Sequence, residues 1–122
     1  MNEQSLSELR MPADAKYILP IRLFIAGVAV RLDFPAETIE DIKMATAEAC
    51  SILLGGVREG SKLLCITKEI DKGMEITLTI EGEKDPSQVD DISVAVLQAM
   101  SDECFISYKK SSVESIKVVF NN

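Results

Sequence analysis

Residues 74–81 read Met-Glu-Ile-Thr-Leu-Thr-Ile-Glu, a strict alternation of apolar and polar side chains. Because successive side chains of a β-strand point to opposite faces, this spacing predicts a strand with one buried and one solvated face. The preceding residues 62–69 are rich in β-prone side chains, and Asp71-Lys72-Gly73 between them has the composition of a turn. The two stretches predict a hairpin in an antiparallel sheet that is covered on one face. Its buried side chains are Met74, Ile76, Leu78 and Ile80.

Two stretches with helical spacing precede the hairpin. Residues 15–32 are apolar on nearly all sides, with Pro20 in the first turn, where its missing N–H matters least. A helix of this kind must be covered on more than one side, either by another helix of the domain or by a second protein chain. Leu19, Leu23, Ala26 and Val30 can form one face, and other apolar residues fill much of the rest. Both possibilities remain open for the side that the sheet does not cover.

The second predicted helix runs from Pro35 to about Leu54 and ends at Gly55-Gly56. Acidic residues gather near its start, where the helix dipole favours negative charge. Its apolar residues recur at helical spacing and mark the side that faces the core: Ile39, Ile42, Ala45, Ala49 and Leu53.

The remaining segments complete the order of elements. Residues 5–11 alternate like a strand that ends at Pro12, residues 89–100 have helical spacing, and 103–109 and 113–120 are further strands. In the third helix, Ile92, Val96 and Met100 lie on one face. The order β-α-α-β-β-α-β-β predicts an α+β two-layer sandwich. Its mixed, mostly antiparallel sheet of about five strands would carry three helices on one face, as a single domain over residues 1–122.

Composition narrows the classes of function. The 122 residues carry a net charge of −7 and contain no histidine, which removes histidine-dependent catalysis and histidine-ligated zinc. An acidic chain without a basic stripe disfavours nucleic acid as a partner. There is no apolar run of about 20 residues and no apolar signal core at the N-terminus, so we expect a cytoplasmic protein without a membrane partner. Three cysteines among apolar neighbours are expected to be buried, reduced thiols: Cys50, Cys65 and Cys104.

Two stretches carry a resemblance to a known family. Residues 40–51 read Glu-Asp-Ile-Lys-Met-Ala-Thr-Ala-Glu-Ala-Cys-Ser, and residues 94–103 read Val-Ala-Val-Leu-Gln-Ala-Met-Ser-Asp-Glu. With the order of elements, they resemble the GHKL (histidine-kinase-like ATPase) superfamily, in particular the bacterial anti-sigma-factor serine/threonine kinases. The resemblance extends over essentially the whole chain. It implies that family's fold, protein partners that are sigma factors or anti-anti-sigma proteins, and self-association through the first helix or the N-terminal strand.

The chain departs from the family where the family binds Mg-ATP. The magnesium-binding asparagine corresponds to Ile52, which has no oxygen to offer. The glycine-rich turn whose aspartate recognises adenine corresponds to Glu81 and Gly82, of which Glu81 is a weak substitute. The phosphate-binding glycines correspond to Asp91-Ile92-Ser93, and a carboxylate about 4 Å from a triphosphate costs about 4 kcal/mol at an effective dielectric of about 20. Only about seven residues stand in place of the long lid.

One catalytic residue is retained in the resemblance. Glu48 matches the glutamate that serves the kinases as general base, and without bound metal and phosphates it would be vestigial. The sequence therefore predicts a regulatory protein-binding module, homodimeric, with no cofactor and no metal. The alternative is an active kinase that uses ATP and magnesium to phosphorylate an anti-anti-sigma partner. A third possibility is that an acidic patch docks a basic partner or calcium, although a solvated charge cluster is the simpler interpretation. That patch consists of Glu81, Glu83, Asp85, Asp90 and Asp91.

Overall fold

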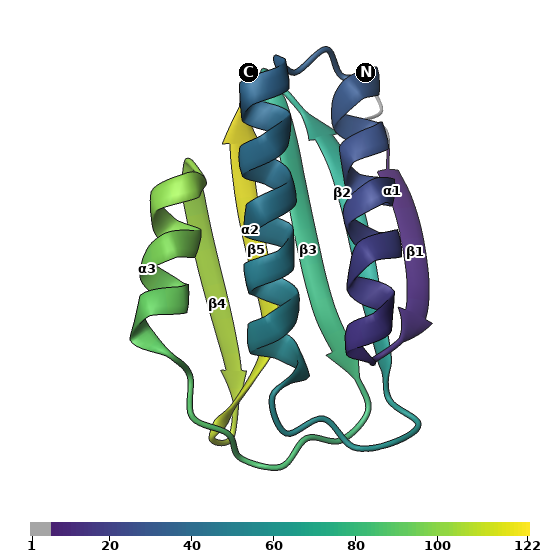
Figure 1. Ribbon diagram of the computed structural model, residues 1–122, viewed down its shortest axis with the longest axis vertical. Helices are drawn as coiled ribbons and strands as arrows, with labels where there is room; N and C mark the ends of the chain where they lie inside the picture. Colours follow the sequence, from purple (N-terminus) through teal and green to yellow (C-terminus); the bar gives the residue numbers. More distant parts are fainter. Residues whose placement is uncertain (1–5) are drawn as a thin grey trace.

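The computed structural model describes residues 6–122 and contains the predicted elements in the predicted order (Figure 1). The boundaries differ from the predicted ones by at most three residues, and those of the strand at residues 103–109 coincide. A short 3-10 helix, Ala15–Tyr17, leads into the first α-helix. The elements are β1 (Leu6–Pro12), α1 (Ile18–Arg31), α2 (Ala36–Leu54), β2 (Lys62–Ile70), β3 (Gly73–Glu81), α3 (Asp91–Met100), β4 (Glu103–Lys109) and β5 (Ser112–Asn121).

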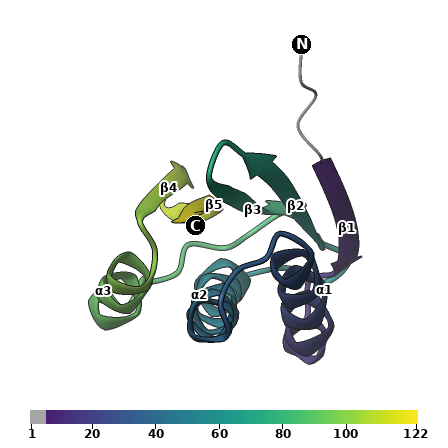
Figure 2. The same ribbon diagram turned by 90° about the horizontal axis from the view of Figure 1, so that it is seen from above.

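The five strands form one sheet in the order β1-β2-β3-β5-β4, and each of its four pairings is antiparallel. The three helices lie in a single layer on one face of this sheet, with α2 between α1 and α3 (Figure 2). The predicted two-layer α+β fold is confirmed. β1 and β4 form the two edges of the sheet, and among the described residues 6–122 no helix lies on its second face.

The core lies between α2 and the central strands. The alternation in β3 is confirmed, since Met74, Ile76 and Leu78 are fully buried and Ile80 nearly so. Four of the five predicted α2 positions are also fully buried, whereas Ile39 at the start of the helix is half-buried. Cys50 and Cys65 lie in this core, and burial raises the pKa of each thiol to about 12, so both stay protonated. Cys104 at the edge is only partly buried.

The apolar face predicted on α3 is not the side that the helix buries. The residue that α3 buries is Leu97, whereas Ile92 is 72% exposed and Val96 and Met100 are half-buried. The reason is that α3 lies at the end of the helix layer, where its main packing partners are α2 and β4. A ten-residue helix at the edge of the layer buries only a narrow side against the core, so most of its apolar residues stay accessible.

The α1 helix divides its apolar residues between two faces. Ile21, Ile25 and Ala29, one turn apart, are fully buried against the domain. The outer face retains exposed apolar side chains, with Leu19, Leu23 and Val30 between 58% and 60% exposed. Within the described residues, the domain therefore covers only one side of α1. Among residues 6–122, none of the helices combines the length and the apolarity that crossing a bilayer requires.

Candidate functional site

The positions singled out by the resemblance lie mainly near one end of the helix layer. α2 ends there, the loop 55–61 leads to β2, and residues 82–90 connect β3 to α3 (Figure 1). We call residues 82–90 the connecting segment. It is slightly longer than predicted, because α3 begins at Asp91 rather than at Val89. It is still an ordinary connection length for a compact domain.

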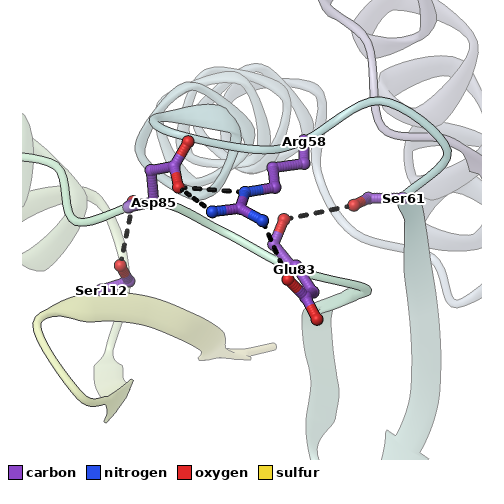
Figure 3. A network of polar contacts seen from close by, with 5 residues as sticks. All are labelled: Arg58, Ser61, Glu83, Asp85 and Ser112. Atoms are coloured by element: carbon purple, nitrogen blue, oxygen red, sulfur yellow. Dashed lines mark hydrogen bonds and ion pairs between the residues drawn. The ribbon is translucent and has the colours of Figure 1, made fainter.

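Side chains tie the connecting segment to the loop that follows α2 (Figure 3). The Arg58 guanidinium donates two hydrogen bonds to Oδ1 of Asp85, from Nη2 at 2.6 Å and from Nε at 3.0 Å. Its Nη1 donates to Oε2 of Glu83 at 3.1 Å. These carboxylates raise the pKa of Arg58, first through the hydrogen bond to Asp85. One cation therefore balances two of the five residues of the acidic patch.

Hydrogen bonds that involve backbone atoms hold the connecting segment from two sides. The Asp85 N–H donates to the Gly56 carbonyl at 2.7 Å, and Oγ of Ser112, at the start of β5, donates to the Asp85 carbonyl at 3.1 Å. Gly56 has φ +74°, and a Cβ at this position would collide with the Asp85 carbonyl oxygen. Lys84 Nζ donates to the Val113 carbonyl at 2.8 Å, and partial burial lowers the pKa of Lys84. The connecting segment is thus anchored both to the α2–β2 loop and to β5.

Replacing Arg58 should loosen this anchor without unfolding the domain. Arg58, Glu83 and Asp85 are all exposed, and exposed ion pairs contribute little to global stability. We expect Arg58→Ala to leave the thermal midpoint almost unchanged and to speed amide hydrogen exchange severalfold at residues 83–85. Lys62→Ala, at an exposed position in β2, is the matched control. Unchanged exchange at these amides would show that the backbone contacts alone hold the segment.

A carboxylate occupies the N-terminus of α3. Oδ1 of Asp90 accepts a hydrogen bond from the Ile92 N–H at 2.9 Å, which makes Asp90 the N-cap of the helix. Asp91 is exposed in the first turn, and Ser93 is half-buried. The free N–H groups of a helix N-terminus attract anions, but here one of them already has an anionic partner from the chain itself.

On α2, Glu48 and Ile52 are one turn apart and therefore lie on the same side of the helix. Ile52 is 9% exposed and belongs to the hydrophobic core. Glu48 is half-buried beside it. Position 52 thus contributes apolar packing at the end of α2.

Glu81 lies away from the other predicted positions. Because Ile80 faces the helices, the side chain of Glu81 points to the helix-free face of the sheet. There it accepts a hydrogen bond from Arg10 Nε at 2.6 Å, and this bond is the main reason that the pKa of Glu81 is lowered. The adjacent Gly82 has φ +137° and packs closely on Ser61, so it serves a tight turn.

The acidic patch is therefore dispersed. Glu81 pairs with Arg10, Glu83 and Asp85 pair with Arg58, and Asp90 caps α3. Within residues 6–122, no group of three or more Cys, Asp and Glu side chains is placed to hold a metal ion. Sequence reasoning missed Arg58. The available signal was an isolated cation in the α2–β2 loop of an acidic chain.

The fold and this site define a two-layer α+β domain with a short, anchored connection where the resembled ATPases carry a lid. A stretch of 44 residues, 36% of this chain, is 50% identical to the serine-protein kinase RsbW of Bacillus thuringiensis (strain Al Hakam). The same identity and coverage are found for RsbW of Bacillus cereus (strain B4264) and of Bacillus anthracis (strain CDC 684 / NRRL 3495). The matched stretch spans 28% of the length of these relatives. No protein-family model matches the chain.

Proposed function

We propose that this chain is a cytoplasmic regulatory protein of the anti-sigma type. It acts by binding a protein partner, a sigma factor or an anti-anti-sigma protein, and it has lost nucleotide binding and kinase activity. The partner class is supported by the two-layer fold together with the 50% identity to RsbW over 44 residues. The observation that carries the loss of activity is the burial of Ile52 in the core, at the position where the resembled enzymes hold magnesium.

Three features of the site fit Mg-ATP poorly. Ile52 presents hydrocarbon where magnesium requires oxygen ligands. Asp90 and Asp91 bring negative charge to the helix N-terminus that a triphosphate would approach. The connecting segment is both short and anchored through Asp85, so it has little freedom to close over a ligand.

The alternative, an active serine/threonine kinase, also has support. Glu48 is retained on α2, and the relatives matched over 44 residues are named as serine-protein kinases. A general base contributes to phosphoryl transfer only when metal and phosphates are positioned beside it. The first property that separates the two functions is whether the folded chain binds Mg-ATP, since phosphoryl transfer requires it.

The outer face of α1 is the surface that we assign to the protein partner. Leu19, Leu23 and Val30 are exposed there, and no acidic residue occurs between residues 15 and 32, although the whole chain carries −7. Nε of Arg22, on the same helix, is buried without a hydrogen-bond partner among the described residues. Arg22 places a cation beside this face, and its guanidinium would pair with a carboxylate of a docking partner. The surface therefore suits an apolar partner segment that carries acidic side chains.

Titration calorimetry tests the proposed class of protein partner. The chain should be titrated, without nucleotide, with the sigma factors and anti-anti-sigma proteins encoded by its own genome. We expect one of them to bind with a dissociation constant of about 1 µM or tighter, as is usual for specific regulatory interfaces. Failure of every such protein to bind would contradict the proposed partner class.

A further inference from the structure

The α1 helix lies over the β1–β2 end of the sheet (Figures 1 and 2), and a cleft of about 650 Å³ separates part of it from the strands. Small-molecule sites typically have volumes of about 300 to 1,000 Å³. The helix side of the cleft is apolar and consists of Phe24, Val28 and Leu32, each of which is half-buried. Among the described residues that line the cleft, none corresponds to the Mg-ATP site of the resembled kinases. The cleft is therefore separate from the site described above.

The floor of the cleft is polar because the side chains of β1 and β2 change in character at this end of the sheet. Leu9 of β1 pairs with Cys65 of β2, and both side chains pack in the core under the helices. The next pair on the same face is Ser7 with Thr67, and both of these residues line the cleft. Hydroxyl side chains thus replace apolar ones where α1 faces the end of the two strands.

The hydroxyl group of Thr67 lacks a partner of the kind that the other buried polar side chains have. Within residues 6–122, those others are Thr46, Ser61 and Ser112, and each donates a hydrogen bond to a backbone carbonyl, at 2.7, 3.4 and 3.1 Å. Thr67 is 1% exposed, and its hydroxyl makes no hydrogen bond with any other described residue. Because an unpaired buried hydroxyl costs free energy, this group calls for a polar partner in the cleft.

Gly27 keeps the helix side of the cleft open. It lies in the middle of α1, where glycine lowers helix stability relative to alanine. Its φ is not positive, and a Cβ at this position would meet no packed neighbour within 4 Å. Neither the backbone nor the packing of the domain therefore requires glycine here. A ligand that occupies the space beside Gly27 accounts for the missing side chain.

Charged side chains of both signs border the cleft. Arg31 comes from the end of α1, Asp33 follows the helix, and Glu69 comes from β2. All three are exposed, and within residues 6–122 none of them forms a salt bridge. A guanidinium group binds a carboxylate, and a carboxylate binds an ammonium group. The border of the cleft can therefore bind both ends of a zwitterion.

We propose that this cleft binds a small zwitterion with an apolar side chain, which is the chemistry of a free apolar amino acid or of a dipeptide of such amino acids. The apolar side chain packs on Phe24 and Val28, the carboxylate pairs with Arg31, and the ammonium group pairs with Glu69. Thr67 supplies a hydrogen bond from the floor. This inference goes beyond the proposed function and depends neither on the protein partner nor on the loss of nucleotide binding.

Titration calorimetry of the full chain with L-leucine, L-phenylalanine and L-leucyl-L-leucine tests the class of ligand. We expect at least one of them to bind with a dissociation constant of about 0.1 mM or tighter. The tighter of the amino acids and the dipeptide identifies the source. N-acetyl-L-leucinamide keeps the apolar side chain without either charge, so it should bind at least about tenfold more weakly. The inference is overturned if all three zwitterions fail to bind at about 10 mM, or if N-acetyl-L-leucinamide binds equally well.

Variants test the location. Gly27→Leu fills the cleft and should abolish binding of the same probe without lowering the thermal midpoint, because the added side chain meets no packed neighbour. Arg31→Gln should weaken binding about tenfold, whereas Lys62→Gln, which removes a cation from the helix-free face, should leave it unchanged. Amide chemical shifts of Ser7 and Thr67 should change when the probe binds. Full affinity in a folded Gly27→Leu chain, or unchanged shifts at both residues, would show that the probe binds elsewhere and would refute the assignment.

Discussion

Ile52→Asn should destabilise the domain by about 3 kcal/mol, or roughly 10 °C in the thermal midpoint, and should not restore ATP binding. Ile52 is 9% exposed in the core cluster, so asparagine at this position loses apolar burial and places an amide among hydrocarbon side chains. Circular dichroism melting measures the loss of stability. Calorimetric titration with Mg-ATP measures whether the amide oxygen of the asparagine restores binding of Mg-ATP.

The matched control is Ile52→Leu, which keeps the volume and the apolar character and should cost less than about 1.5 kcal/mol. An asparagine variant as stable as the parent would show that position 52 is still a polar site. Gain of Mg-ATP binding by that variant would show that one missing oxygen, rather than the whole site, separates this chain from a kinase.

The second large effect is expected at Arg22. Arg22→Glu reverses the charge beside the exposed face of α1 and removes the N–H that lacks a partner. We expect affinity for the protein partner to fall at least 30-fold, the effect of losing about 2 kcal/mol at an arginine hot spot. Calorimetric titration of the partner into each variant measures it, and melting curves confirm that the variant is folded.

Lys62→Glu is the control for Arg22. It makes the same change of charge at an exposed position of β2, on the helix-free face of the sheet. Arg22→Ala separates loss of the guanidinium from repulsion, and it should weaken binding less than Arg22→Glu. Equal affinity of Arg22→Glu and the parent chain would remove α1 as the partner surface.

The parts of the fold that the sequence predicted well are those with strong periodicity. The alternation from Met74 to Ile80 and the helical spacing from Ile42 to Leu53 each reflect burial on one side, and both were confirmed. α3 was predicted less well, because an apolar helix at the edge of a layer has several possible buried faces. The packing of the folded domain, rather than the local sequence, selects Leu97 as the buried residue.

The candidate functional site shows the same limit of prediction from the sequence. The local sequence was enough to predict Ile52 and Asp91 as departures from the resembled motifs, because each departure concerns the type of a single residue. The side of the sheet that Glu81 faces depends on the register with β2, which brings it beside Arg10. The anchoring of Asp85 joins residues 27 positions apart, to Arg58 on one side and to Ser112 on the other. Contacts of that separation follow from the folded topology and have no local signature.

Thermal melting with and without 5 mM Mg-ATP tests the central claim most directly. If residues 52, 90 and 91 have closed the former nucleotide site, the two midpoints should agree within error. Binding at a concentration about 100 times the dissociation constant would stabilise the fold by about 2.7 kcal/mol, which is a shift of several degrees. A shift of that size, seen with Mg-ATP and absent with magnesium alone, would contradict the loss of nucleotide binding and favour an active kinase.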